Sequence, residues 1–123
     1  MKFQLTVAPG EAVFTGYGEG YVSVNHERYE HSVILAAGQP VAGWDAERFE
    51  TLARTHFEAL LALGPEVVIF GAGRTLRFPP HELTQPLAQA GIGLEVMDTG
   101  AACRTYNILV AEGRKVVAAV LLP

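Results

Sequence analysis

The sequence predicts one α/β domain over residues 1–123, with a central mixed, mostly parallel sheet, flanking helices in a three-layer arrangement and an N-terminal β-hairpin extension. Three observations predict it. The apolar runs 67–70 and 116–122 are typical of strands that are covered on both faces. The second half alternates strand-like and helix-like segments, which favours parallel strands joined by right-handed crossovers. The first half holds short strand-like runs separated by glycines.

The elements of the first half are predicted to be mainly strands. Apolar residues alternate with polar ones over 3–7, and the runs 13–15 and 21–24 are rich in β-forming residues. The polar segment 25–30 predicts a turn or hairpin tip, and 33–37 is the next expected strand. Glycines at alternate positions from 16 to 20 indicate bulges or close backbone packing, because no helix follows that a phosphate loop would require.

The clearest predicted helix spans residues 46–63. Asp45 is a suitable N-cap, since its carboxylate can accept hydrogen bonds from first-turn N–H groups. Apolar side chains recur at helical spacing, His56 lies on the apolar stripe as an expected hydrogen-bonded core residue, and Gly64 with Pro65 ends the helix. The remaining predicted elements are a strand at 67–70, a helix at 83–90, a strand at 92–97, a helix at 99–112 and a strand at 116–122.

Composition excludes several classes of function. The chain has a net charge of −4 and no basic stripe, so nucleic acid is not an expected partner. A single cysteine excludes an internal disulfide and a multi-cysteine metal site. No apolar signal-peptide core follows the start, and no apolar run reaches the length of a membrane span. We therefore expect a cytoplasmic protein without a transmembrane segment, for which peripheral docking on a membrane complex is open.

Histidines and glycines offer motifs that are incomplete. His26 and His31 would fit a zinc-protease motif only if histidine stood at Glu30 or at Glu27, so no metal site is expected. The loop 71–73 follows an apolar strand, as a dinucleotide loop does, but Leu76 stands at the third glycine position and Pro79–Pro80 prevents a helix there. No cofactor is therefore expected. A tight glycine turn at the carboxyl end of a strand remains, and ligands bind at that edge of open α/β sheets.

The predicted helix at 99–112 carries two reactive side chains. Cys103 lies near its start beside Arg104, where a helix N-terminus and a cation favour thiolate, although a lone cysteine is also typical of a small buried side chain. Arg104 points away from the apolar face, near Ile108, and could bind a carboxylate or phosphate or tie down a loop. If the strands before Gly73 and Thr99 are neighbours, their N–H groups converge on one rim and form an anion-sized pocket.

The segment 91–107, with the sequence GIGLEVMDTGAACRTYN, carries a family resemblance together with the hairpin 17–20, the Gly-x-Gly loop and the last strand. The chain resembles a small family of conserved proteins of unknown function that includes the mitochondrial complex I assembly factor three and an adipogenesis-associated single-domain protein. Ala72 stands where a threonine is common in that family. The resemblance implies a three-layer α/β fold and action through protein partners in respiratory complex assembly. It implies no catalytic residue and no cofactor.

Three functions stay open. A non-catalytic interaction or assembly protein is favoured by the lack of a nucleophile–base pair, and it predicts an exposed apolar patch with Ile108, Leu76 and Phe78. A small-molecule or anion-binding protein, even a weak enzyme, would use the glycine-loop rim. A thiol-dependent redox protein needs an exposed Cys103. The candidate ligand or partner site comprises Gly71, Gly73, Thr99, Cys103, Arg104 and Asn107.

Overall fold

Two fully buried strands form the centre of the protein, seen in a computed structural model that describes residues 11–123. Their sheet has, in spatial order, β5 (Ala42–Gly43), β4 (Val33–Ala36), β8 (Val116–Val120), β6 (Val67–Gly71) and β7 (Gly93–Met97). β6 runs parallel to both of its neighbours, whereas β4 runs antiparallel to β8 and to β5. The predicted mixed, mostly parallel sheet is confirmed, with β4 as the one reversed strand among the described residues.

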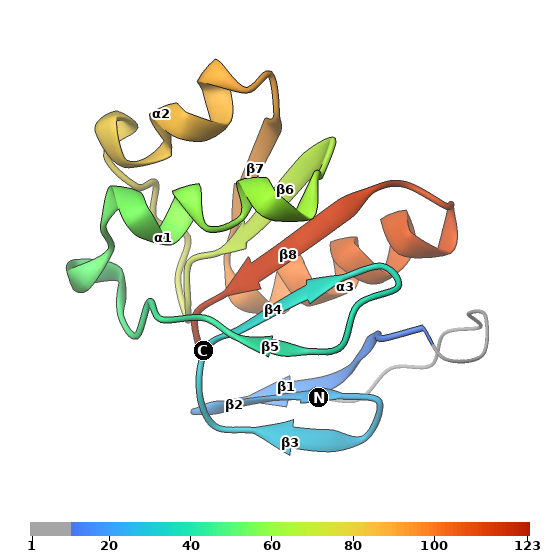
Figure 1. Ribbon diagram of the computed structural model, residues 1–123. Coiled ribbons are helices and arrows are strands. Elements are labelled where there is room, and N and C mark those ends of the chain that lie inside the picture. Colours follow the sequence, from blue (N-terminus) through green and yellow to red (C-terminus); the bar gives the residue numbers. More distant parts are fainter. Residues whose placement is uncertain (1–10) are drawn as a thin grey trace.

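Helices cover the two faces of this sheet (Figure 1). α3 (Thr99–Ala111) packs on one face through Ala102 and Tyr106, and α1 (Arg54–Glu58) and α2 (His81–Gln89) pack on the other. Alternate residues of β6 serve the two sides: Ile69 lies in the α3-side core, and Phe70 lies in the core under α1 and α2. The three-layer arrangement is therefore confirmed.

A second, antiparallel sheet packs against α3. It consists of β1 (Phe14–Gly18), β2 (Tyr21–Val24) and β3 (Glu27–Tyr29), in that order. The expected N-terminal hairpin is present, but the polar segment 25–30 is not only a turn. Asn25 and His26 have positive φ angles of 50° and 70°, which suit a two-residue hairpin turn, so the chain reverses there and continues as a third strand.

The long helix predicted for residues 46–63 is wrong. Short pieces replace it: η1 (Phe49–Thr51), α1 and η2 (Leu61–Leu63). Asp45 does not cap a helix; α1 instead begins after Ala53, whose N–H donates to His56 Nδ1 at 3.0 Å. The His56 carbonyl accepts the indole N–H of Trp44 at 3.1 Å. In a continuous α-helix this carbonyl would accept the Leu60 N–H, which bonds to the Phe57 carbonyl instead. Tertiary packing around Trp44 thus outweighs the local helical pattern.

The strand run predicted at 13–15 continues as β1 through Gly16 to Gly18, and the other predicted elements agree with the structure to within two residues at their ends. α2 begins at His81 rather than at 83, and β8 ends at Val120 rather than at 122. The predicted alternation over 3–7 lies outside the described residues. No helix in the described part of the chain is both long and apolar enough to cross a membrane.

Candidate functional site

The carboxyl ends of three parallel strands meet at one edge of the sheet, and Thr99 joins them. Its hydroxyl accepts the Gly73 N–H at 2.9 Å and donates to the Leu121 carbonyl at 2.6 Å. Its own N–H donates to the Gly73 carbonyl at 2.8 Å. The predicted convergence of the Gly73 loop and the α3 start is therefore present. Both N–H groups, however, bond within the protein rather than point toward a ligand.

The start of α3 already holds a carboxylate. Asp98 Oδ1 accepts the Ala101 N–H at 2.9 Å, which makes Asp98 the N-cap. A negative charge thus occupies the electropositive end of the helix. An anion would have to bind beside this carboxylate.

Arg104 lies on the exposed side of α3 and contacts the β1–β2 hairpin. Its Nη1 donates to the hydroxyl of Tyr17, and its guanidinium carbon lies 5.8 Å from the centre of the Tyr17 ring. Among the described residues, no ion pair involves Arg104. The same helix meets Tyr17 at Gly100, where a Cβ atom would lie 2.8 Å from the ring. Arg104 therefore joins α3 to the small sheet while its side chain remains reachable from solvent.

A cavity of about 410 Å³ lies beside Arg104. Its lining is Tyr17, Gly18, Glu19, Gly73, Arg74, Asp98, Gly100, Arg104 and Pro123. Of the rim residues predicted from the sequence, Gly73 and Arg104 reach this cavity, whereas Gly71 and Thr99 do not line it. Gly71 is buried, and a Cβ atom there would lie 2.8 Å from Val120 Cγ1, so its small size serves close packing.

Asn107 holds the small sheet onto α3. Its Oδ1 accepts the Phe14 N–H at 2.9 Å, and its Nδ2 donates to the Phe14 carbonyl at 2.7 Å. The Asn107 side chain is buried, and its two hydrogen bonds satisfy the backbone N–H and carbonyl of Phe14 in the way that a neighbouring strand would. The Phe14 ring also packs edge-on against Tyr106 at a centroid distance of 5.7 Å. This geometry gives Asn107 a structural function.

Cys103 faces the core beneath Arg104. The side chain is fully buried, and burial raises the pKa of the thiol far above its ordinary value. Cys103 therefore lacks the exposure that a thiol-dependent redox function requires.

We expect the Cys103 thiol of the folded protein at pH 8 to resist a maleimide reagent and the urea-unfolded protein to react completely, as followed by intact-mass spectrometry. Rapid labelling of the folded protein would contradict this placement.

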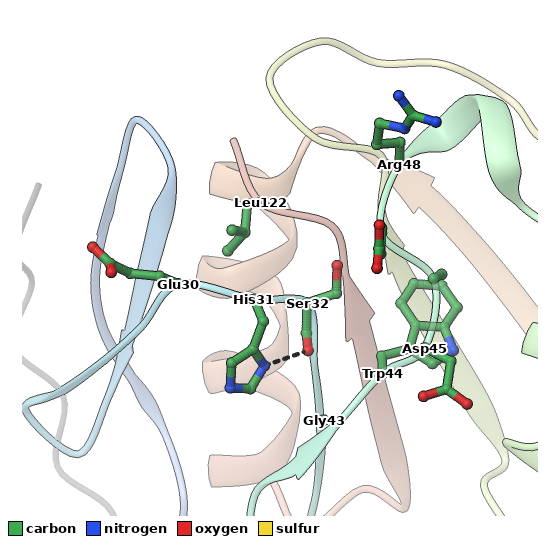
Figure 2. Close-up of a pocket in the computed structure, with 10 residues that line it drawn as sticks. Glu30, His31, Ser32, Gly43, Trp44, Asp45, Arg48 and Leu122 are labelled. Atoms are coloured by element: carbon green, nitrogen blue, oxygen red, sulfur yellow. Dashed lines mark hydrogen bonds between the residues drawn. The ribbon is translucent and has the colours of Figure 1, made fainter.

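A larger cavity, of about 620 Å³, lies at the same edge between the small sheet and the segment after β5 (Figure 2). Its lining is Glu30, His31, Ser32, Gly43, Trp44, Asp45, Ala46, Glu47, Arg48 and Leu122. The His31 Nδ1 lies 3.0 Å from the Ser32 carbonyl oxygen, and the backbone N–H of Trp44 donates to the same oxygen at 2.9 Å. Sequence reasoning missed this cavity. Its signal in the sequence was the polar segment 30–32 before the predicted strand at 33–37 together with the charged residues in 45–48, which β4–β5 pairing brings together.

Among the described residues, histidine, cysteine, aspartate and glutamate side chains form no group of three or more that could hold a metal ion.

A family model described as "Protein of unknown function (DUF498/DUF598)" matches residues 14–121, which include both sheets and every helix in the described part of the chain. The chain belongs to this family. The resemblance that the sequence itself carries is thereby confirmed.

Curated relatives of this DUF498/DUF598 protein include one that is named as a membrane protein and several that are named as assembly factors. The "13 kDa major membrane protein" of Francisella tularensis subsp. holarctica (strain LVS) is 34% identical over 104 residues, covering 84% of this chain and 85% of the relative. The "NADH dehydrogenase [ubiquinone] 1 alpha subcomplex assembly factor 3" of Bos taurus is 39% identical over 88 residues, covering 69% of this chain and 47% of the relative. The chain thus spans about half the length of the assembly factors that it matches.

Solved structures share the family fold. A crystal structure of a Bordetella parapertussis protein is 41% identical, with a TM-score of 0.88 and coverage of 94% of this chain and 99% of that one. A solution NMR structure of a Bordetella pertussis protein, described as an Mth938-like domain, is 35% identical, with a TM-score of 0.80 and coverage of 98% and 92%. The α/β fold of the DUF498/DUF598 protein is therefore supported by experimental structures of relatives.

The apolar residues predicted for an interaction surface are exposed in this DUF498/DUF598 protein. Phe78 is 70% exposed, Ile108 54% and Leu76 52%. They do not line one common cavity. Phe78 lines a groove with β7 and α2, whereas Ile108 lies on α3, which covers the opposite face of the sheet.

Proposed function

We propose that this protein is a non-catalytic assembly factor that acts through protein contacts during the biogenesis of a respiratory NADH dehydrogenase. The observation that carries the proposal is the 39% identity to the Bos taurus assembly factor across 69% of the chain. Within the described residues, the side chains at the candidate site are mostly engaged in structure. Thr99 and Asn107 satisfy buried backbone groups, and the Cys103 thiol is enclosed.

Exposed side chains on α3 support a role in contacts. Arg104 and Ile108 are four residues apart on the same helix and therefore neighbours on its surface. Arginine is one of the residue types enriched at energetically important interface positions. A free anion has less support as the ligand of the adjacent cavity, because Asp98 already caps the helix and Glu19 also lines the wall.

Deletion of the gene in its native host tests the proposal. We expect membranes of the deletion strain to lose assembled NADH dehydrogenase, seen on native gels and as NADH oxidation, because its subunits would lack their assembly partner. Succinate dehydrogenase in the same membranes is the control and is expected to be unchanged. Normal assembly of NADH dehydrogenase without the protein would contradict the proposal.

Complementation then examines α3. We expect Arg104→Ala to restore assembly poorly and to reduce capture of NADH dehydrogenase subunits by the tagged protein about tenfold, which corresponds to the loss of about 1.4 kcal/mol of binding. Arg74→Ala is the matched control, because Arg74 is exposed in the same cavity and lies outside α3. Equal behaviour of the two variants would remove Arg104 from the proposed contact surface.

A further inference from the structure

β7 is an edge strand with unused backbone groups. Among residues 11–123 it pairs with β6 alone. The Gly93 N–H donates to the Glu66 carbonyl at 3.2 Å, and the Met97 carbonyl accepts the Ala72 N–H at 2.8 Å, so the odd-numbered residues bond inward. In a parallel pair alternate residues bond to a given neighbour, and the N–H and C=O groups of Leu94 and Val96 therefore point outward. Such an edge is a template for another strand.

A groove lined by both apolar and polar residues runs beside this edge. A cavity of about 500 Å³ is lined by Phe78, Pro79, His81, Thr84, Leu94, Glu95 and Val96. The side chains of Leu94 and Val96 pack on the α2 side of the sheet, next to the exposed Phe78 ring. A strand added to β7 would place its own alternate side chains on this side. Apolar side chains at those positions would cover the exposed ring.

Glu95 gives the edge a charge preference. It pairs with Ile69 of β6, whose side chain packs in the α3-side core, so the Glu95 side chain also lies on the α3 side, where it is exposed. It forms no ion pair or side-chain hydrogen bond with any described residue. Opposite charges stabilise directly facing residues of two strands, and like charges destabilise them. A basic residue is thus the favoured neighbour of Glu95.

The same charge argues against a second copy of this chain. An antiparallel pairing of two β7 strands that used all five residues would be centred on Glu95. Each Glu95 would then face the other one, and two carboxylates would repel each other across the new interface. The edge therefore suits a different protein better than itself.

We propose that the outer edge of β7 accepts an extended segment of a partner protein as an additional strand. The segment has apolar side chains toward the Phe78 groove and a lysine or arginine opposite Glu95. Main-chain hydrogen bonds to Leu94 and Val96 supply general affinity, while the groove and Glu95 select the sequence. The inference rests on the proposed function, because it specifies how a protein partner of this factor is held.

A synthetic peptide in which valines alternate with threonines around one central lysine is the probe. In NMR titrations of the isotope-labelled protein, we expect chemical-shift changes centred on the Leu94 and Val96 amides and around Phe78. A peptide with glutamate at its centre should bind about fivefold more weakly, which corresponds to the roughly 1 kcal/mol that a facing charge pair contributes at most, and this preference should reverse with Glu95→Lys. Absence of shifts along β7 with the lysine peptide would overturn the proposal.

A pair of variants separates backbone pairing from side-chain packing. Val96→Pro removes an outward N–H that the fold does not use, whereas Val96→Ala shortens the same side chain and keeps that N–H. We expect Val96→Pro alone to abolish peptide binding, with both variants showing native amide dispersion. Equal binding by the two variants would contradict strand addition. A concentration-dependent dimer in ultracentrifugation that only Val96→Pro dissolves would replace the partner strand with a second copy.

The outcomes for the edge and for the proposed function are distinguishable. Peptide binding at β7 together with normal NADH dehydrogenase in the deletion strain would leave the edge site standing and remove the assembly role. Defective assembly in the deletion strain, with full rescue by Val96→Pro and no peptide binding, would keep the assembly role and overturn the edge site.

Discussion

Replacement of Asn107 by leucine is expected to destabilise the protein by about 3 kcal/mol, because two buried backbone groups lose their partner. The leucine fills a similar volume but cannot bond to the Phe14 N–H and carbonyl. Pairing with β2 cannot replace these bonds without moving β1 away from α3. Thermal unfolding followed by circular dichroism should show a midpoint lowered by about 10 °C.

A neighbouring position supplies the control for Asn107→Leu. Ile108 lies on the same helix and is 54% exposed, so Ile108→Ala should change stability by no more than about 0.5 kcal/mol. If the two variants unfold at the same temperature, the bidentate contact of Asn107 does not contribute as the structure indicates.

Thr99→Val is expected to cost about 2–3 kcal/mol with almost no change in side-chain shape. The hydroxyl is the acceptor for the Gly73 N–H and the donor to the Leu121 carbonyl, and both groups would remain buried without a partner. Urea denaturation should report the loss as a lower midpoint with an unchanged slope.

Thr99→Ser is the matched variant, because it keeps the hydroxyl and removes only the methyl group. It should retain most of the stability that the valine variant loses. A serine variant as unstable as the valine variant would attribute the effect to packing rather than to hydrogen bonding.

The sequence was informative where local pattern and tertiary environment agree. The apolar runs of β6 and β8 indicated central strands, and the helix predicted at 99–112 agrees with α3. It failed where a distant group decides the backbone. The indole of Trp44 bonds to a carbonyl 12 residues away, and no periodicity within 46–63 could indicate that the helix is interrupted there.

The candidate site shows the same division. Sequence position placed Gly73 and Thr99 at one rim, because both follow parallel strands, and the structure confirms that they meet. It did not indicate that the Thr99 side chain would satisfy the backbone groups, since that depends on Leu121, which follows β8, lying alongside. The cavity around His31 and Trp44 was missed because it forms only when β4 and β5 pair.

The position of β8 has a consequence for biosynthesis. It is the last strand of the described chain, yet it lies in the middle of the large sheet, between β4 and β6. A nascent chain shorter than residue 116 can hold the β4–β5 hairpin and the β6–β7 pair, but no strand pairing joins these two halves, and both cores lack the residues that β8 contributes. Cooperative folding must therefore wait until β8 has left the ribosome, and until then the apolar edges of both halves depend on protection from aggregation.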